Sequence, residues 1–325
     1  MSFTRDIADY PEGIVLAVDK PYRWTSADVI RKLKYAAIRH FGKKNLKVGH
    51  AGTLDPLATG VLLVCIGNAC KRAQELQDHD KEYIARIRFG ATTPSYDLEK
   101  EVDRRFPYEH ITADAVRAAL PAFLGEQEQV APLFSAKSVD GVRAYELARK
   151  LYKAQTKSVI PSATSVIPSE VEGSLFDDAA LETLHRSRIT ISELELLEYT
   201  EESIGVAEPM ATLGRVRGRG PEPLEERCEW EGSRSDGSGT SMPSSKASTA
   251  SSRIHVADTA ALGLPEATIR IACSKGTYIR AFARDLGEAL GSGAHLSGLI
   301  RSRSGAFTID KALSVEEALA LLQAD

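Results

Sequence analysis

A glycine-rich loop that leads directly into an apolar segment is the feature that most restricts the fold of this chain. The loop "HAGTLDPLATG", residues 50–60, presents a single carboxylate, Asp55, and the segment "VLLVCIG", residues 61–67, follows it. A short apolar run bounded by glycines is typical of a buried strand. The proline after Asp55 favours extended backbone, and the glycines allow another backbone or a ligand to approach closely. Two interpretations stay open at this point: a simple Asp-Pro turn, or a carboxylate held rigidly for catalysis.

The other hydrophobic patterns predict both strands and helices, so the expected fold class is mixed α/β. Alternation in "KEYIARIRFG" places Tyr83 on one face of a strand and Arg86 and Arg88 on the other. Ser26 is predicted to cap the first helix, which follows it directly. The predicted strands span 13–20, 61–67, 81–90, 188–199 and 267–274, and the further helices span 112–125, 141–154, 277–291 and 314–323.

Two segments of low complexity interrupt these patterns. Residues 155–185 repeat "SVIPS" and then become acidic, and residues 231–252 consist almost entirely of Gly, Ser, Thr and other small residues. Neither segment has enough apolar side chains to offset the entropy of ordering it. Because strand and helix patterns resume after each, we expect flexible insertions within a single domain, residues 1–325.

Positive charge is concentrated near the start of the chain, although the formal net charge of the whole is −4. Between Lys20 and Lys47 there are nine Lys or Arg residues and one acid, Asp28. A basic patch is the electrostatic signature of proteins that bind a phosphate backbone. A solvated helix face can have the same composition, so this feature alone leaves nucleic-acid binding open.

Nothing in the sequence predicts secretion, a membrane span or a zinc site. The first residues, "MSFTRDIADYPEG", carry acids and a proline where a signal peptide needs a basic and then an apolar run. No stretch approaches the roughly 18 consecutive apolar residues of a membrane-spanning helix. The four cysteines, at 65, 70, 228 and 273, have no C-x-x-C spacing. We therefore expect a cytoplasmic protein with reduced thiols.

Five blocks of sequence carry a family resemblance. They are "KPYRWTS" (20–26), "GTLDPLATG" (52–60), "KEYIARIRFGATTPSYD" (81–97), "APLFSAKSVDGVRAYELAR" (131–149) and "CSKGTYIRAFARDLG" (273–287). In order and spacing these blocks resemble the TruB family of tRNA pseudouridine synthases. The resemblance runs from about residue 11 to about residue 320, apart from the two insertions, and the second and fifth blocks are its most specific signatures.

This resemblance implies the pseudouridine synthase fold, with a largely antiparallel central sheet and flanking helices. It implies an enzyme that breaks the N1–C1′ bond of uridine at position 55 in the T-loop of tRNA, rotates the base and rejoins it through C5. Because the target base must leave its stack, such an enzyme flips it out. The resemblance implies no metal and no organic cofactor. The implied partner is tRNA, bound through its T-arm, and we expect a monomer with no membrane or protein partner.

The resemblance also implies roles for individual residues. Asp55 is the catalytic carboxylate, Arg280 is the cation that keeps it ionised, and Tyr83 stacks on the flipped base or takes part in a proton transfer. The implied substrate-binding residues are His50, Tyr83, Tyr278, Leu299, Lys20 and Asp97. The implied clamp on the T-arm phosphates consists of Lys137, Arg143 and Arg149.

The chain departs from the family pattern at four positions outside the catalytic set. Arg23 stands where the family has Gly, so we expect the turn there to be reshaped. The other three departures are Ser95, Lys100 and Ile300. Because only 18 residues follow Phe307, we expect no C-terminal PUA-type RNA-binding domain of the kind that many relatives carry.

Three other functions stay as alternatives. A non-catalytic RNA-binding or RNA-folding module would keep the basic patch but would not need Asp55 together with Arg280. A uracil-removing glycosylase could use a similar carboxylate, but it would release the free base. A pseudouridine synthase that acts on ribosomal RNA would share the catalytic fold, and the wording of the two signature blocks favours the tRNA branch.

Overall fold

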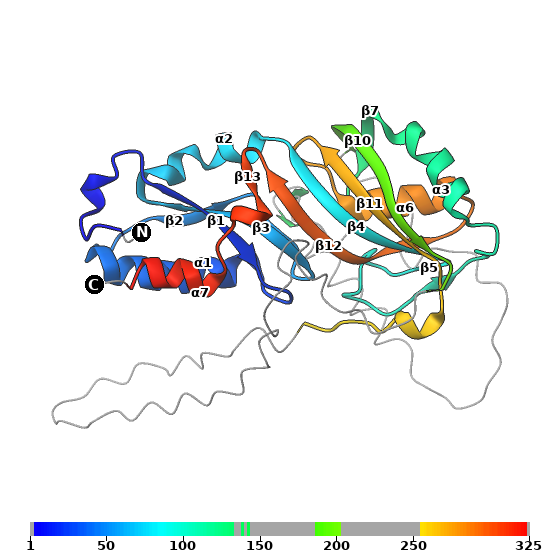
Figure 1. Ribbon diagram of the computed structural model, residues 1–325, viewed down its shortest axis with the longest axis horizontal. Helices are drawn as coiled ribbons and strands as arrows, with labels where there is room; N and C mark the ends of the chain where they lie inside the picture. The colour runs from blue at the N-terminus through cyan, green and yellow to red at the C-terminus, as the bar shows by residue number, and fades with distance from the viewer. Residues whose placement is uncertain (1–2, 133–137, 140–141, 144–185, 203–253, 324–325) are drawn as a thin grey trace, which may run out of the picture.

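One long twisted sheet forms the framework of the molecule (Figure 1). The computed structural model describes residues 3–132, 138–139, 142–143, 186–202 and 254–323. Nine strands within these ranges share the sheet: β1 (Ile14–Lys20), β2 (Val48–Ala51), β3 (Ala58–Ile66), β4 (Lys81–Phe89), β7 (Gly125–Val130), β10 (Arg186–Thr200), β11 (Glu266–Cys273), β12 (Ala294–Ser304) and β13 (Phe307–Thr308). Their order is β1-β3-β12-β4-β11-β10-β7, with β2 paired to β3 and β13 paired to β12.

Neighbouring strands of this sheet are antiparallel, except where β3 meets β12. There residues 299–301 pair in parallel with residues 58–60. Two small pairs lie outside the sheet: β5 (Ala91–Thr92) with β6 (Arg104–Arg105), and β8 (Ser138–Val139) with β9 (Val142–Arg143). The predicted mixed α/β class with a largely antiparallel sheet is confirmed.

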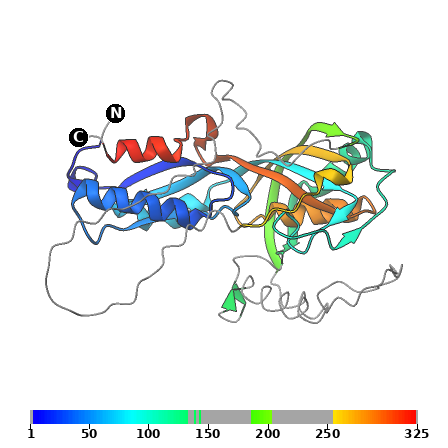
Figure 2. The same cartoon turned by 90° about the horizontal axis from the view of Figure 1, so that it is seen from below.

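Helices pack on the sheet toward both of its ends. They are α1 (Ser26–Phe41), α2 (Ala73–Asp78), α3 (Ala113–Ala119), α6 (Ile279–Ala289) and α7 (Val315–Leu321), with 3-10 turns η1 (Ile7–Asp9), η2 (Gly67–Arg72), η3 (Leu120–Phe123), η5 (Ala260–Leu262) and η6 (Ile309–Lys311). Helices α1 and α7 lie side by side near the two termini (Figures 1 and 2), whereas α6 packs on β12 and β4. Among the described residues, no helix is long and apolar enough to cross a membrane.

The first helix begins one residue earlier than its predicted cap implies. The Thr25 hydroxyl accepts a hydrogen bond from the amide of Asp28 (3.1 Å), and the Asp28 carboxylate accepts one from the amide of Thr25 (3.0 Å). This reciprocal pair is a capping box. The prediction of Ser26 as the cap was wrong, because the Ser26 hydroxyl is bonded to the backbone of Leu54 instead.

Two predicted helices also need correction. The one predicted at 112–125 ends at Ala119 and continues as the 3-10 turn η3, because Pro121 cannot donate the next helical hydrogen bond. In the one predicted at 141–154, residues 142–143 form strand β9, and residues 144–154 lie outside the described part of the chain. The predicted insertions lie outside it too, so the single-domain organisation stays a prediction.

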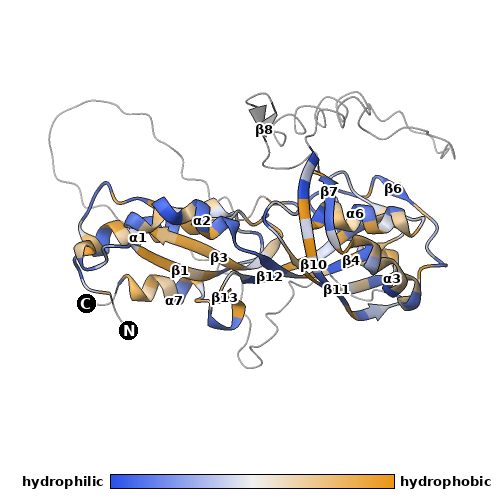
Figure 3. Ribbon diagram, turned by 90° about the horizontal axis from the view of Figure 1, so that it is seen from above, coloured by the Kyte–Doolittle hydropathy of each residue, from blue (hydrophilic) through white to orange (hydrophobic). Residues whose placement is uncertain are grey.

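The apolar run of β3 is explained by cover on both of its faces. Strands β1 and β3 are apolar along most of their length (Figure 3). On one face of β3, Leu62 and Val64 belong to the main core, to which α1 and α7 also contribute. On the other face, Val61 and Leu63 join a smaller cluster that includes residues of α2. A strand that is buried on both faces has no need to alternate.

Strand β4 alternates as predicted, but both of its faces are also covered. Tyr83 is buried on one face, as expected from the pattern. On the other face Arg88 is buried as well, and its guanidinium donates to the Glu266 carboxylate (2.8 Å) and to the Thr259 hydroxyl (2.7 Å). An alternating strand therefore predicts which side chains share a face, but not which face meets solvent.

Candidate active site

The loop that carries Asp55 packs directly on the backbone of β12. Gly60 has a φ of +100°, which L side chains rarely adopt, and a Cβ atom there would lie 2.3 Å from the carbonyl oxygen of Arg301. Gly52 also has a positive φ, +93°. The Asp55 carbonyl closes the turn by accepting a hydrogen bond from the amide of Ala58 (3.1 Å). The glycines of the loop therefore allow the close backbone approach that the sequence predicted.

Two residues of the sequence block 20–26 also form hydrogen bonds to the backbone of this loop. The Ser26 hydroxyl accepts from the amide of Leu54 (2.9 Å) and donates to its carbonyl (3.1 Å). The Lys20 ammonium group is buried, and it donates to the Pro56 carbonyl (3.2 Å) and to two carbonyls of its own turn. Burial lowers the pKa of Lys20 to about 7, although nearby Asp55 opposes the shift. Lys20 thus contacts the backbone of the loop.

Arg23 joins the same contact network from a left-handed turn. Its φ is +63°, which costs a non-glycine residue about 1–2 kcal/mol. Its amide donates to the Pro56 carbonyl (2.9 Å), and its guanidinium donates to the carbonyl of Ile254 (2.6 Å). The backbone at Arg23 therefore has the conformation that glycine favours, and whether the turn is reshaped relative to the family stays a prediction.

A buried arginine of β12 holds the backbone of the loop through hydrogen bonds. Arg301 is only 1% exposed, and its guanidinium donates to the carbonyls of Gly52 (3.1 Å), Thr53 (3.4 Å) and Val61 (2.7 Å). These three carbonyls lie on both sides of Asp55 in the sequence. The backbone of the loop is therefore bound at several points by other elements, and Asp55 projects from a rigid support.

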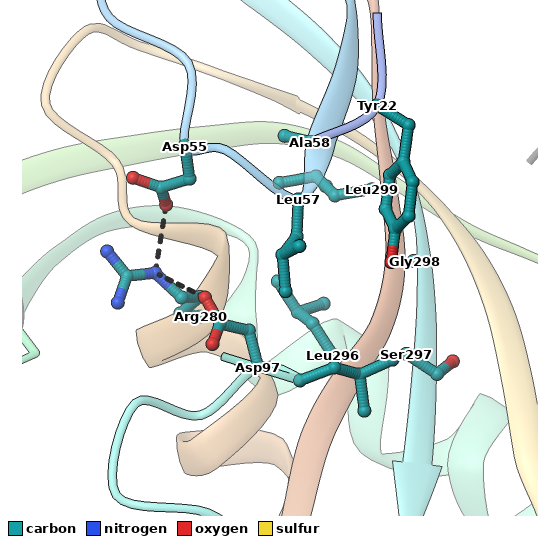
Figure 4. A pocket seen from close by; sticks show the side chains of 11 residues that line it. Tyr22, Asp55, Leu57, Ala58, Asp97, Arg280, Leu296, Ser297, Gly298 and Leu299 are labelled. Carbon is teal, nitrogen blue, oxygen red and sulfur yellow. Dashed lines mark hydrogen bonds and ion pairs between the residues drawn. The ribbon is translucent and has the colours of Figure 1, made fainter. Parts of the chain in front are cut away.

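The side chain of Asp55 meets the first turn of α6. The Arg280 Nε atom donates to Asp55 Oδ2 at 2.9 Å and lies 3.7 Å from Asp97 Oδ2 (Figure 4). A second nitrogen of Arg280 donates to the Ser95 carbonyl (3.1 Å). The Arg280 side chain is 6% exposed, whereas that of Asp55 is 42% exposed. Arg280 therefore orients a carboxylate that an incoming substrate can still reach.

Asp97 lies behind this ion pair. It is buried, and its Oδ1 accepts from the Ser95 hydroxyl (2.6 Å) and from the amide of Glu99 (2.9 Å). Burial raises the pKa of Asp97, while the positive charge of Arg280 opposes that shift. Burial alone would lower the pKa of Arg280, but Asp55 and Asp97 raise it above its ordinary value. The guanidinium thus stays charged between two carboxylates.

A pocket of about 220 Å³ opens beside the ion pair. Its walls come from the loop of residues 52–55, from the start of β4, from the loop before α6 and from β12. Among the residues that line it are five that the sequence predicted for the site: Asp55, Tyr83, Tyr278, Arg280 and Leu299. A concave site with mixed polar and apolar walls is typical of small-molecule binding sites.

A smaller hollow also borders the ion pair (Figure 4). It has apolar walls, including Leu57 and Leu299, and is also lined by Asp97 and Tyr22. Burial raises the pKa of Tyr22, and the negative charge of Asp97 adds to that shift. Asp55 and Arg280 line both hollows, so they form part of the partition between them.

Comparison with known proteins agrees with this geometry. Residues 39–167 match the model of the TruB family pseudouridylate synthase N-terminal domain. A protein of Phocaeicola vulgatus named tRNA pseudouridine synthase B is 41% identical over 95% of this chain and 92% of its own length. The chain belongs to the TruB family. A protein of Thermus thermophilus with the same name is 35% identical over 93% of this chain and 76% of its own length.

A solved structure shares the fold of this TruB family member at lower sequence similarity. One chain in the crystal structure of a Cbf5-Nop10-Gar1 complex is 20% identical, with a TM-score of 0.51. The match covers 97% of this chain and 56% of that one. At this identity the likeness supports the fold alone.

Tyr83 is the aromatic residue of β4 that lines the pocket of this TruB family member. It is 9% exposed and faces Arg301 of the neighbouring strand. Burial raises the pKa of Tyr83, while the Arg301 guanidinium partly opposes that effect. A phenol with a raised pKa stays protonated at neutral pH, and its role in stacking or in proton transfer stays a prediction.

The remaining predicted residues lie at different depths around the pocket. Tyr278 immediately precedes α6, and its backbone exchanges two hydrogen bonds with the Gln129 side chain (2.8 and 3.2 Å). His50 lies on β2 and is not among the residues that line the pocket. Burial lowers the pKa of His50, and the positive charge of Arg301 lowers it further.

The predicted clamp on the T-arm falls almost entirely outside the described part of this TruB family member. Lys137 and Arg149 are not described, and for Arg143 only the backbone, in β9, is described. Their binding role stays a prediction. Among the residues that are described, no group of three or more His, Cys, Asp or Glu side chains is arranged to hold a metal ion.

Among the pocket residues that were not predicted as site residues of this TruB family member, two are basic and buried, Arg301 and Lys81. Arg301 lines the pocket and holds its loop, and Lys81 lines it from the first position of β4. Burial lowers the pKa of Lys81 to about 8, and Arg301 adds to that shift. A signal was present for Arg301, since it follows Leu299 by two residues and so lies on the same face of a strand.

Proposed function

We propose that this protein converts uridine to pseudouridine at position 55 in the T-loop of tRNA. The observation that carries the proposal is the ion pair between Asp55 and Arg280 at the wall of a pocket also lined by Tyr83. The similarity of more than 90% of this chain to proteins named tRNA pseudouridine synthase B supports the reaction and the class of RNA. We place this activity in the cytoplasm, and we expect a monomer that needs no cofactor.

The reaction needs a carboxylate that is ionised, accessible and fixed in position. The uracil N1–C1′ bond breaks, and Asp55 either attacks C1′ or stabilises the positive charge that develops there. The freed base rotates, and its C5 forms the new bond to C1′. The C5 proton is lost, N1 gains a proton, and the product is an isomer of the substrate. Arg280 holds the carboxylate in line with the pocket throughout.

Access to C1′ requires the uridine to leave the stacked T-loop. Unstacking costs a few kcal/mol, which a flipping enzyme offsets through contacts in its pocket. Tyr83 provides an aromatic surface for the base, and Leu299 and Tyr278 line the same pocket. The rigid loop around Asp55 then keeps the carboxylate close to the sugar while the base turns.

Replacement of Tyr83 by phenylalanine separates stacking from proton transfer. The ring stays in place and the hydroxyl is removed, so we expect a single-turnover rate within about fivefold of the parent enzyme if stacking is the main contribution. Tyr83→Ala is the matched control, and its rate should fall by a further factor of at least about ten. A loss in Tyr83→Phe that equals the loss in Tyr83→Ala would assign the essential role to the hydroxyl.

The structure also bears on the non-catalytic alternative. A protein that only binds RNA gains nothing from a buried arginine between two carboxylates, because desolvation of such charges is costly. Here the arginine contacts a carboxylate that stays partly exposed beside a pocket. This arrangement favours catalysis over passive binding.

Mapping the product on an unmodified tRNA transcript tests the proposal directly. After incubation with the purified protein, carbodiimide treatment followed by reverse transcription should give one new stop, at tRNA position 55. An equimolar ribosomal RNA transcript in the same reaction serves as the control and should stay unmodified. A stop at another position, or in the ribosomal RNA alone, would replace the substrate that we propose.

A further inference from the structure

Helix α1 extends from the candidate active site toward one end of the molecule (Figure 1). Its first residue, Ser26, is bonded to Leu54, next to Asp55. The helix continues for 16 residues, which corresponds to about 24 Å at 1.5 Å per residue. Its outer face is therefore a surface that begins at the pocket and leads away from it.

This outer face is strongly cationic. Seven Lys or Arg residues on α1 and in the turn after it are exposed: Arg31, Lys32, Lys34, Arg39, Lys43, Lys44 and Lys47. Within the described part of the chain, Arg31 alone of these seven has an acidic ion-pair partner, Asp28 at 2.8 Å. Most of the positive charge is therefore not neutralised locally, in a chain whose formal net charge is −4. We call these seven residues together with Tyr35 the α1 surface.

Tyr35 is the unusual member of the α1 surface. It is 73% exposed, the highest value among the large hydrophobic side chains of the described residues. Arg31 and Arg39 lie one helical turn before and after it, on the same face of the helix. Tyr35 and Arg39 also line a surface hollow of about 340 Å³, together with Arg5 and His40. The aromatic ring of Tyr35 does not pack against the hydrophobic core on the inner side of α1.

A second hollow continues the cationic surface beyond the end of α1. It has a volume of about 720 Å³, and three lysines, Lys43, Lys47 and Lys71, line it with Tyr10. An exposed aromatic ring between cations, next to basic hollows, is the chemistry that binds RNA: cations contact phosphates and the ring stacks on a base. A helix face that is merely solvated does not need the exposed ring.

We propose that the α1 surface binds the part of the substrate tRNA that lies beyond the T-arm. The inference rests on the proposed function, because the RNA is the one whose T-loop occupies the pocket beside Asp55. A T-arm held there leaves the rest of the tRNA outside the pocket, and the α1 surface is a cationic region that starts at that point. Phosphate contacts from Lys34, Arg39 and Lys43 supply affinity, and Tyr35 stacks on an exposed base.

A charge variant and a ring variant test the two contributions separately. In the charge variant (Lys34→Gln, Arg39→Gln and Lys43→Gln), the dissociation constant for full-length tRNA should rise at least about tenfold. Its salt dependence, as the slope of log K against log[salt], should become shallower by about 2 to 3, since each lost phosphate contact contributes slightly less than one. In Tyr35→Ala the dissociation constant should rise about tenfold with an unchanged slope, and Tyr35→Phe should bind as the parent does.

Two controls connect the effect to this surface and to tRNA. An isolated T-arm hairpin should bind all of these variants, and be modified by them, as it is by the parent enzyme. A charge-matched variant on other elements (Arg72→Gln, Arg117→Gln and Arg270→Gln) should leave the affinity for full-length tRNA within about twofold of the parent value. Each of these three arginines is paired with an acid, two of them are exposed and Arg270 is half-buried. The net charge changes equally in both variants.

The outcomes distinguish this inference from the proposed function. Unchanged affinity for full-length tRNA in the charge variant overturns the inference, and so does an equal loss for the hairpin or in the charge-matched control. Those results leave the chemistry at Asp55 untouched. If the parent enzyme modifies neither the hairpin nor the full-length tRNA, the proposed function itself fails.

Discussion

Asp55→Asn is expected to abolish pseudouridine formation and to leave tRNA binding unchanged. The amide matches the carboxylate in size, but it has no charge with which to attack C1′ or to stabilise a cation there. We expect the single-turnover rate to fall by at least about 10⁴-fold, in the range found when a central catalytic group is removed. Release of tritium from C5-tritiated uridine in tRNA measures the rate, and filter binding measures the affinity.

The control for this variant is Asp114→Asn, which removes an exposed carboxylate of α3 that does not line the pocket. Its rate should equal that of the parent enzyme. Both proteins must come from a host that lacks an enzyme of this specificity. A rate in Asp55→Asn above about one per cent of the parent value would show that another group carries the reaction.

Arg280→Met is expected to lower both the rate and the stability. Without the guanidinium, Asp55 loses the contact that orients it, and we expect a loss of about 10²–10³-fold in the single-turnover rate. The same change leaves the buried carboxylate of Asp97 without its cation, which costs about 3–5 kcal/mol of unfolding free energy. Denaturant unfolding gives the second value, and tritium release gives the first.

A second substitution separates these two effects. In the double variant Arg280→Met with Asp97→Asn, no buried charge is left uncompensated, so most of the stability should return while the activity stays low. Because burial already raises the pKa of Asp97, Arg280→Met alone should be more stable at low pH, where the carboxyl is protonated, and should lose stability as the pH rises. Full activity in the double variant would mean that Arg280 acts on stability alone.

The sequence predicted best those features that depend on neighbouring residues. The glycine-rich loop and the strand after it follow from local glycines, a proline and an apolar run. The structure has both, but the loop is shorter than predicted, because β2 includes residues 50–51 and β3 begins at Ala58. The contact between Asp55 and Arg280 spans 225 positions, so no local pattern could reveal it. It was expected because two separate sequence blocks resemble one family, and the fold brings those blocks together.

The features that were missed depend on tertiary packing. A period of two would place Leu299, Arg301 and Arg303 on one face of β12, but the register against β4 shifts after Arg301, so Arg301 pairs with Tyr83 and Arg303 pairs with the next residue, Glu82. The pattern therefore does not predict that Arg301 is buried and Arg303 is not. Burial of that charge depends on backbone carbonyls presented by a loop about 240 residues earlier. The N-cap of α1 is Thr25 and not the predicted Ser26 for a related reason, since the Ser26 hydroxyl is hydrogen-bonded to the distant loop at Leu54.

The parallel pairing of β3 with β12 affects when the active site can form during synthesis on the ribosome. The loop around residue 55 is made early, but its support includes Arg301, and its partner cation is Arg280. A nascent chain that ends before residue 301 therefore lacks the strand on which this loop packs. Contacts between such distant positions form slowly, because the entropy cost of closing a long loop comes before the contacts contribute any stabilising free energy. We expect nascent chains to be inactive toward RNA until β12 has emerged and joined the sheet.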